Sequence, residues 1–250
     1  MRSIPISEIN PSELASDGAV RTPRPTFRLQ PLSRWTLFRQ KPEIILFVVL
    51  ILVFNLPVLF GTVWNSMVFE PEAVRAGEWW RLLTHPFVHL TWYHLMLDGM
   101  AFLSLYCSLN ERRIFVRLGY VVAAGTGSLV ASWIAVPAIS TSGLCGLSGI
   151  AHGLMAISAI ELLGGDKTER RIGWISLILV LGKASFETIT GKMVFGFLDF
   201  GLLGSPVAVS HAGGIIGGLI AMLVLALRRQ TCRGSTDYNL SETFRWIFGY

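Results

Sequence analysis

Residues 143–163 read GLCGLSGIAHGLMAISAIELL, a segment in which a glycine-rich loop passes into an apolar run. The apolar part is long enough to form a helix that lies among other helices or in lipid. Ser148 stands at the first turn of this helix, and His152 follows four residues later on the same face. A polar pair at the start of such a helix needs a functional or structural reason.

The composition of the whole chain is that of a membrane protein. Of the 250 residues, 52% are hydrophobic and only 15% are charged, whereas soluble domains have about 25% charged residues. The formal net charge is +5, but the basic residues lie between apolar runs rather than in one patch, so no nucleic-acid partner is predicted. The three cysteines lack paired or metal-type spacing, so neither a disulfide framework nor a cofactor is expected.

Six apolar runs follow one another along the chain. A helix needs about 20 apolar residues to cross the hydrocarbon of a bilayer. Runs near this length occur at 44–64, 88–109, 118–137, 147–163, 173–189 and 207–227. The fourth and fifth are short and carry polar groups, but the neighbouring runs favour a membrane location. The sequence therefore predicts an all-α membrane protein with a bundle of six transmembrane helices.

The distribution of lysine and arginine predicts the orientation of the chain. The connections on one side hold few basic residues, namely Arg75, Arg81 and Lys192. The positive-inside rule therefore places both termini in the cytoplasm, and a bacterial inner membrane is the expected location. We divide the chain into a basic, proline-containing arm at 1–43, a six-span domain at 44–228 and a cytoplasmic tail at 229–250. The arm lacks the apolar core of a signal peptide, and we expect it to be disordered. Its basic residues are expected either to bind anionic lipid headgroups or to act as a retention signal.

Polar residues gather at one depth in this topology. The second, fourth and sixth runs all pass from outside to inside, and their early turns hold His94 with Asp98, Ser148 with His152, and His211. Ionisable residues inside a membrane are costly and normally face a cavity or a partner. The five side chains are therefore predicted to meet in the outer half of the membrane.

Small residues predict which helices approach most closely. Glycines four positions apart let two helices approach closely. They occur on the fourth run as Gly149 with Gly153, and on the sixth run as Gly213 with Gly217 and Gly214 with Gly218. Close packing there would bring the Ser148 hydroxyl to the His211 imidazole, which could act as its base. Gly146 would allow a tight turn, and the free Ser148 N–H could donate to an oxyanion.

The residues alone leave alternatives open. A satisfied serine and a packing histidine in a glycine-rich bundle would have the same pattern. No carboxylate is evident near His211, so the minimal unit is a dyad.

Lys183 and Glu187 have i,i+4 spacing and are expected to form an interfacial salt bridge or to edge a lateral gate. A Ser148–Lys183 dyad is a further alternative. The spacing of His85 and His89 could suit zinc, but the intervening Pro86 and the absence of HExxH argue against it.

Three separated segments resemble the rhomboid intramembrane serine proteases. They are EWWRLLTHPFVHLTWYHLMLD, GLSG and SHAGGIIGG, and the resemblance extends over about 64–227. It implies a six-helix bundle with a water-filled cavity that opens to the outside, in which membrane-anchored substrates are cleaved. By this resemblance Ser148 is the nucleophile, His211 the base and His94 a residue of the oxyanion hole. Trp80 and Arg81 match the Trp–Arg pair of the first loop.

Two positions depart from the usual rhomboid pattern. Rhomboids generally have asparagine where Asp98 stands, and an aromatic residue where His152 stands. Asp98 and the GLSGIAHG segment look like the rhombosortase branch, which implies substrates with a carboxy-terminal Gly-Gly, transmembrane and basic sorting signal. An ionised Asp98 would repel an oxyanion, so we expect it to orient His94 instead, or to bond a neighbouring helix. His152 is expected to pack against His211, with a role as alternative base left open.

The predicted function is therefore an intramembrane serine endopeptidase. Its partners would be a single-span transmembrane protein substrate and membrane lipid, and it would need no metal. Two other functions remain possible. A catalytically silent rhomboid-like protein would bind membrane clients and tolerate replacement of Ser148. A small proton-linked transporter would depend on Asp98 but not on Ser148.

Overall fold

The computed structural model describes residues 41–137, 139–194 and 207–231. These residues lie in one compact unit, Arg34–Tyr250, whereas a second unit, Met1–Ser33, lies outside the described residues. The predicted disorder of the arm and the predicted tail at 229–250 also fall outside them, apart from a few residues at each boundary.

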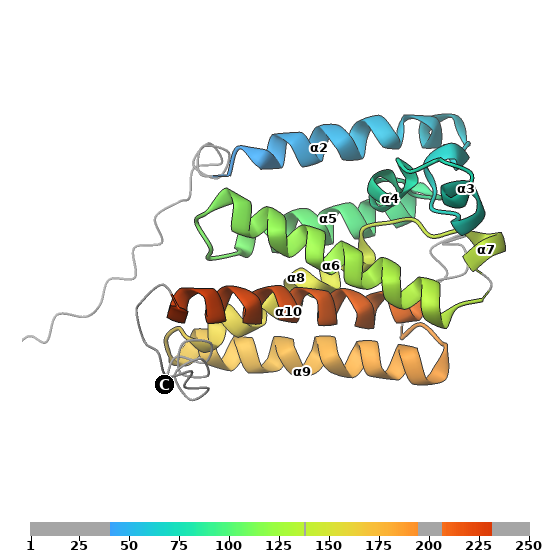
Figure 1. Cartoon of the computed structure of the whole chain (residues 1–250). Helices are drawn as coiled ribbons and strands as arrows, with labels where there is room; N and C mark the ends of the chain where they lie inside the picture. The colour runs from blue at the N-terminus through green and yellow to red at the C-terminus, as the bar shows by residue number, and fades with distance from the viewer. Residues whose placement is uncertain (1–40, 138, 195–206, 232–250) are drawn as a thin grey trace, which may run out of the picture. The chain divides into compact units, whose positions relative to one another are not determined.

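Helices occur at all six of the predicted runs (Figure 1). They are α2 (Glu43–Phe54), α5 (Trp92–Ser108), α6 (Ile114–Ala135), α8 (Ser148–Leu163), α9 (Lys167–Thr190) and α10 (Ala208–Thr231). Short helices fill the connections: η1 (Leu56–Phe60), η2 (Asn65–Met67), α3 (Pro71–Arg75), α4 (Arg81–Thr84), η3 (His85–Phe87) and α7 (Ile139–Ser142). The described residues form no named strand and contain one isolated β-bridge, between Phe69 and Leu144. The all-helical prediction is confirmed.

Two helix boundaries differ from the predicted runs for local reasons. The first run is not one helix to residue 64: α2 ends at Phe54 and the chain continues as η1, because Pro57 has no N–H to donate inside an α-helix. α9 begins at Lys167, before the apolar run starts, because Asp166 and Glu169 form a capping box. This charged first turn is part of α9 but lies outside the apolar run.

Four segments are long and apolar enough to cross a membrane. They are Glu43–Phe60, Ile114–Ala135, Lys167–Thr190 and Ala208–Arg228. α5 and α8 are shorter, with 17 and 16 residues. Many large apolar side chains on the outer faces are exposed, for example Leu52, Ile134 and Ile178, as expected of surfaces that meet lipid. The structure therefore supports a membrane protein, and six spans remain a prediction.

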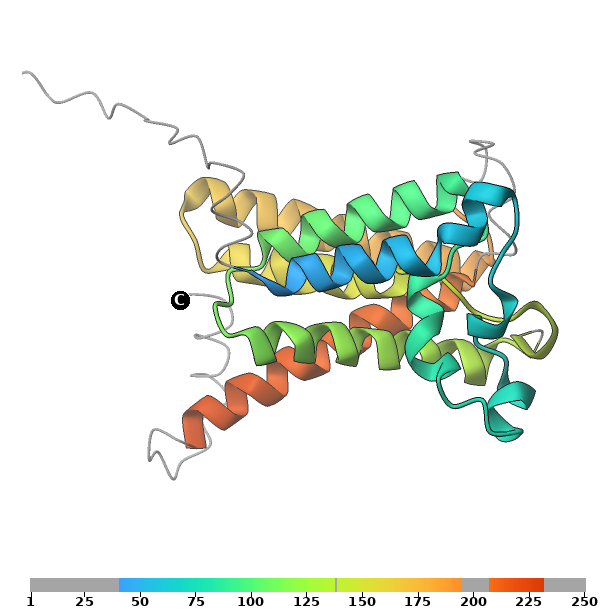
Figure 2. The same ribbon diagram turned by 90° about the horizontal axis from the view of Figure 1, so that it is seen from above.

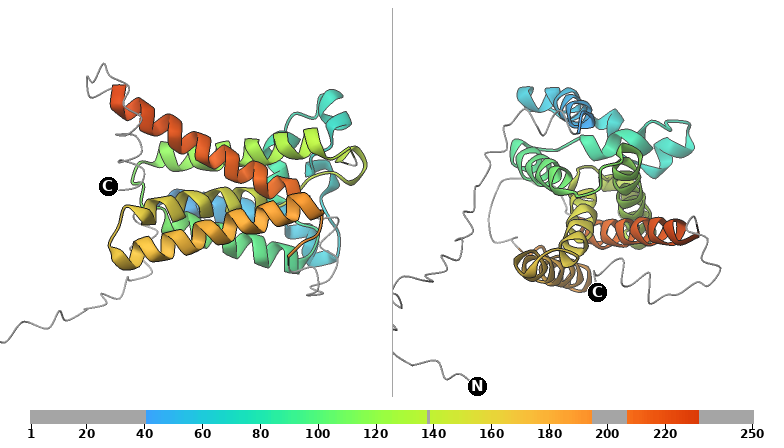
Figure 3. Two further views of the ribbon diagram at one scale, coloured as in Figure 1. Left: turned by 90° about the horizontal axis from the view of Figure 1, so that it is seen from below. Right: turned by 90° about the vertical axis from the view of Figure 1, so that its left-hand side faces the viewer.

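α8 is the central helix of the bundle. It packs against α5, α6, α9 and α10, and the end-on view in Figure 3 shows it in the middle of them. Most of its side chains are buried, among them Leu154, Ile157 and Leu163. A helix that is apolar on all sides is stable only when other helices surround it. α2 lies at the edge of the bundle (Figure 1), and the view from above shows α5 running alongside it (Figure 2). Phe47 of α2 contacts Phe102 and Tyr106 of α5.

Glycines allow the closest helix contacts, as predicted for α8 and α10. A Cβ added to Gly214 would overlap the backbone carbonyl of Gly149, and one added to Gly153 would lie 2.5 Å from the carbonyl oxygen of Gly214. Gly213 faces α6 instead, where its Cβ would overlap the carbonyl of Gly127. Close packing at these glycines fixes the distance between the first turns of α8 and α10.

Candidate active site

A constrained loop places Ser148 at the start of α8. Leu144 is bridged to Phe69, with N–H to O distances of 2.9 and 3.0 Å, and Gly146 N–H donates to the carbonyl of His85 at 3.1 Å. Gly146 has a positive φ of 99°, and a Cβ there would lie 2.7 Å from His94 Nε2. Only glycine fits this position, in agreement with the sequence prediction.

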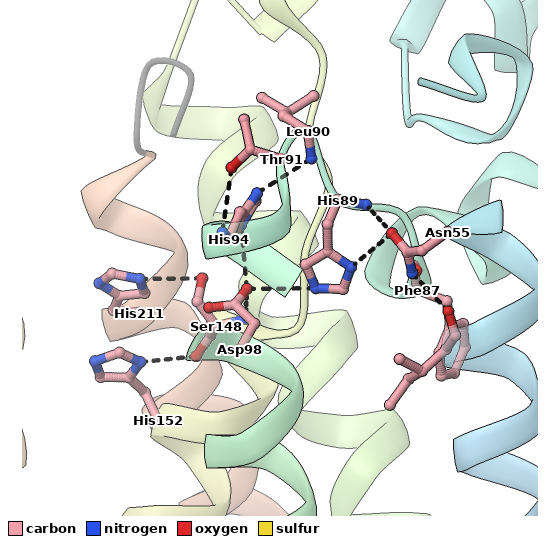
Figure 4. Close-up of polar contacts among 11 residues, drawn as sticks. Asn55, Phe87, His89, Leu90, Thr91, His94, Asp98, Ser148, His152 and His211 are labelled. Carbon is pink, nitrogen blue, oxygen red and sulfur yellow. Dashed lines mark hydrogen bonds and ion pairs between the residues drawn. The ribbon is translucent and has the colours of Figure 1, made fainter. Parts of the chain in front are cut away.

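The Ser148 hydroxyl meets His211 from the first turn of α10 (Figure 4). Ser148 Oγ lies 3.1 Å from His211 Nε2. Ser148 is partly buried, and His211 is buried. A hydroxyl at this distance from an imidazole nitrogen can transfer its proton to that nitrogen. The two residues are 63 positions apart in the chain. Their contact is the one expected from their similar depth in the predicted topology.

A buried carboxylate that the sequence analysis did not place at the site holds the other side of His211. Glu187 Oε2 lies 2.7 Å from His211 Nδ1, and Glu187 is fully buried. The expectation that no carboxylate lies near His211 is wrong. The prediction from sequence rests on the early turns of α5, α8 and α10, whereas Glu187 stands in the last turn of α9. Under the predicted topology this turn lies at the same outer depth.

His152 and Lys183 complete this side of the site. The His152 ring stacks on His211 with centroids 3.9 Å apart and an interplanar angle of 14°, so the expected packing is present. Its Nδ1 lies 2.7 Å from the carbonyl oxygen of Ser148. Lys183 Nζ lies 3.0 Å from His152 Nε2 and 2.8 Å from the Glu187 carboxylate. The expected Lys183–Glu187 pair forms, but Glu187 is buried in the bundle and not at an interface.

Asp98 and His94 lie on the opposite side of Ser148 (Figure 4). Asp98 Oδ2 accepts the N–H of Ser148 at 3.0 Å and lies 3.2 Å from His94 Nε2. The N–H of Leu90 points to His94 Nδ1 at 3.4 Å, so the network assigns the proton of a neutral His94 to Nε2, facing Asp98. The expected contact between Asp98 and His94 is present. The carboxylate also occupies the Ser148 N–H that the sequence analysis assigned to an oxyanion.

His89 extends this group towards α2. Asn55 donates from Nδ2 to the carbonyls of Ile51 and Phe87, so its Oδ1 accepts from His89 N–H at 2.9 Å and from His89 Nδ1 at 3.2 Å. His89 Nε2 is then an unprotonated nitrogen in a neutral ring, and it lies 3.7 Å from Asp98 Oδ2. Within the described residues this nitrogen has no hydrogen-bond partner.

Comparison with known proteins places these motifs in a family. The family model of the rhomboid domain matches residues 76–228. The chain belongs to the rhomboid family. It is 30% identical over 172 residues to the rhomboid protease GluP of Bacillus subtilis (strain 168), an alignment that covers 68% of this chain and 29% of that protein. The chain thus spans less than a third of the length of GluP, and no solved structure matches it.

The Trp–Arg pair of the rhomboid resemblance lies in the connection between α2 and α5 and not beside Ser148. Arg81 is buried, and its Nη1 donates to the carbonyls of Asn65 and Val68 at 2.8 and 2.6 Å. Trp80 Nε1 donates to the carbonyl of Ser66 at 3.0 Å. The pair therefore holds the loop that leads into α4 and η3.

His85 links that loop to the turn before Ser148. Its Nδ1 lies 3.0 Å from the carbonyl oxygen of Arg81, and its own carbonyl accepts the N–H of Gly146. Burial lowers the pKa of His85 to about 4, because the charged form loses its hydration there. His85 is thus a neutral residue whose Nδ1 is occupied by the Arg81 carbonyl.

Two groups in this rhomboid site have side chains close enough to hold a metal ion. They are His89, His94 and Asp98, and His152, Glu187 and His211. In the second group the Lys183 ammonium already supplies a positive charge between His152 and Glu187. In the first, His94 Nε2 lies 3.2 Å from Asp98 Oδ2, and a hydrogen bond between these atoms accounts for the contact without an ion. Neither arrangement requires a metal.

Proposed function

We propose that this rhomboid-family protein is an intramembrane serine endopeptidase with Ser148 as nucleophile and His211 as general base. The observation that carries this proposal is the 3.1 Å distance between Ser148 Oγ and His211 Nε2 at the first turns of two closely packed helices. Membership of a family that includes a rhomboid protease adds support. No cofactor takes part in the proposed reaction.

The proposed reaction follows the arrangement of these groups. His211 Nε2 takes the hydroxyl proton while Ser148 Oγ attacks the carbonyl carbon of the scissile peptide bond, giving a tetrahedral oxyanion. Collapse of this intermediate breaks the C–N bond, and His211 returns the proton to the leaving amine. Water, activated by His211, then hydrolyses the acyl-enzyme in the same way. Backbone N–H groups at the start of α8 are proposed as oxyanion donors.

His94 is the proposed side-chain donor to the oxyanion. Its assigned Nε2–H points to Asp98 Oδ2, which also accepts the Ser148 N–H. Both donors therefore converge on one position beside the nucleophile. An oxyanion would take this position from the Asp98 carboxylate oxygen.

The proposed substrate is a single-span membrane protein cut near its extracytoplasmic boundary. α5 and α8 would complete six spans with the four long segments, in a bacterial inner membrane with both termini in the cytoplasm. Asp98 and His152 support the rhombosortase branch, for which the substrates would carry a carboxy-terminal Gly-Gly, transmembrane and basic signal. A glycine pair resists helix formation, so it would expose the scissile carbonyl more readily than a regular helix does.

The proposal is tested by fluorophosphonate labelling of the full chain in detergent. We expect the wild type to be labelled at one serine, with labelling lost in Ser148→Ala and reduced by about 10³-fold or more in His211→Ala. Ser104→Ala, which changes an exposed serine on α5, serves as the matched control and should be labelled like the wild type. A folded wild-type protein that is not labelled would contradict the proposal and favour the silent client-binding protein or the transporter.

A further inference from the structure

We propose that Glu187 is a positioning residue for His211. Lys183 keeps Glu187 ionised and keeps His152 neutral, with the proton of His152 on Nδ1. Ser148 and His211 would then belong to a Ser–His–Glu triad rather than a dyad. This inference rests on the proposed function. The starting observation is the 2.7 Å contact of Glu187 Oε2 with His211 Nδ1 on the side of the ring opposite Ser148.

The hydrogen bonds form a closed ring that returns to Ser148. In order, the contacts are Ser148 Oγ to His211 Nε2 at 3.1 Å, His211 Nδ1 to Glu187 at 2.7 Å, Glu187 to Lys183 Nζ at 2.8 Å, Lys183 Nζ to His152 Nε2 at 3.0 Å, and His152 Nδ1 to the Ser148 carbonyl at 2.7 Å. The ring therefore joins α8, α9 and α10 at their outer ends.

The chemistry of the groups assigns a direction to each bond. A backbone carbonyl only accepts, so the Ser148 carbonyl takes the proton of His152 Nδ1. A neutral His152 then has a lone pair on Nε2, which accepts from the Lys183 ammonium. The same ammonium donates to the Glu187 carboxylate. Glu187 accepts from His211 Nδ1, which leaves the lone pair of His211 on Nε2, facing the Ser148 hydroxyl.

This assignment distinguishes the two histidines. His211 presents a free lone pair to Ser148 Oγ, as a general base must. His152 presents an N–H to the backbone of Ser148, and its other nitrogen is already occupied by Lys183. His152 therefore cannot accept the serine proton in this arrangement. The alternative base suggested by the sequence is disfavoured, and so is a Ser148–Lys183 dyad, because both Lys183 contacts are to other residues.

Burial and charge explain why both Glu187 and Lys183 are needed. Glu187 is fully buried, and a buried carboxylate is tolerated only with charged or hydrogen-bonding partners. It has His211, Lys183 and the N–H of Val194 at 3.2 Å. Before the reaction, Lys183 balances the charge of Glu187. When His211 takes the serine proton, the new positive charge lies directly beside the carboxylate, as in other serine-protease triads.

The test measures fluorophosphonate labelling rates in detergent for four variants of the full chain. Glu187→Gln keeps the size of the side chain but removes its charge and leaves the Lys183 ammonium unpaired near His211. We expect the maximal labelling rate to fall by about 10²–10⁴-fold and the half-saturating probe concentration to stay within about twofold. Glu169→Gln, an exposed position on the same helix, should match the wild type.

Two further variants separate a charge effect from a structural one. Glu187→Gln combined with Lys183→Met removes both charges, so the ammonium no longer opposes the charged imidazole, and we expect about a tenfold recovery over Glu187→Gln alone. Glu187→Asp keeps the carboxylate but draws it back from His211 Nδ1. It should label about tenfold more slowly than the wild type at an unchanged melting temperature, and it remains informative if Glu187→Gln does not fold.

The outcomes of this test are distinct from those of the proposed function. If wild type and Glu187→Gln are labelled at the same rate while Ser148→Ala is not labelled, Ser148 is an activated nucleophile and the role of Glu187 is refuted. A double variant no faster than Glu187→Gln would refute the charge balance by Lys183. If the folded wild type is not labelled at all, the proposed function itself fails.

Discussion

Asp98 is the residue whose charge conflicts most directly with the proposed chemistry. Its Oδ2 accepts from Ser148 N–H and faces His94 Nε2, and both donors are the ones that an oxyanion at Ser148 would use. A carboxylate and an oxyanion cannot share the same donors without strong repulsion. The carboxylate must therefore be displaced or protonated before the tetrahedral intermediate forms.

Replacing Asp98 by asparagine tests this conflict. The amide oxygen of Asp98→Asn can still accept from His94 or Ser148, and the negative charge beside the oxyanion is gone. We therefore expect fluorophosphonate labelling at the wild-type rate or up to about tenfold faster. Asp98→Leu is the companion variant; it leaves Ser148 N–H without an acceptor and should be slower. A loss of more than about tenfold in folded Asp98→Asn would show that the carboxylate is required.

Individual residues differ in how far the sequence could place them. Ser148, His211, His94 and Asp98 follow from one rule, that the early turns of helices with the same direction lie at the same depth. α9 runs in the opposite direction in the predicted topology, so its last turn, which holds Glu187, lies at the same depth. A rule that considers only the early turns of helices does not include this residue. Tautomers cannot be read from sequence, because each depends on a partner atom supplied by another helix.

At the scale of helices, glycine contacts control how close the reacting groups come. The first turns of α8 and α10 approach through Gly149 and Gly214, where neither backbone leaves room for a side chain. The sequence predicted this contact from the spacing of small residues. The contact of Gly127 in α6 with Gly213 and Gly217 was not predicted, although Ala123, Gly127 and Ala131 have the same four-residue spacing of small residues.

Alanine at Gly214 should separate the two helices. Its Cβ would overlap the carbonyl of Gly149, which is backbone and cannot turn aside. We expect Gly214→Ala to lower the free energy of unfolding by about 1–3 kcal/mol or more, and to slow labelling of Ser148 as well. The matched control is Gly182→Ala on α9, where an added Cβ meets nothing within 4 Å and should stabilise by up to about 1 kcal/mol.

Thermal unfolding in detergent checks both glycine variants under the same conditions. An unchanged melting temperature for Gly214→Ala would mean that α10 can move away from α8 at little cost. The contact between Gly149 and Gly214 would then not define the distance from Ser148 to His211.

At the scale of the whole molecule, the short central helix explains how a polar site can lie within a membrane. α8 has 16 residues, which gives a length of about 24 Å against about 30 Å of hydrocarbon. Three of the helices that pack against it are longer, namely α6 with 22 residues and α9 and α10 with 24 each. Ser148 can therefore begin α8 below the membrane surface, while the loop before it is bonded to Phe69 and His85 rather than exposed to lipid.

The number of spans is testable because the two short helices decide on which side each connection lies. If α5 and α8 cross the membrane, single cysteines replacing exposed Glu72 and Lys192 face outward, and those replacing Arg112 and Lys167 face the cytoplasm. In a chain whose natural cysteines are replaced by alanine, we expect a membrane-impermeant maleimide to label the first pair in intact cells. The second pair should be labelled only after lysis. Labelling of Arg112→Cys in intact cells would mean that α5 does not cross the bilayer, and it would place the connection after α5 on the same side as Ser148.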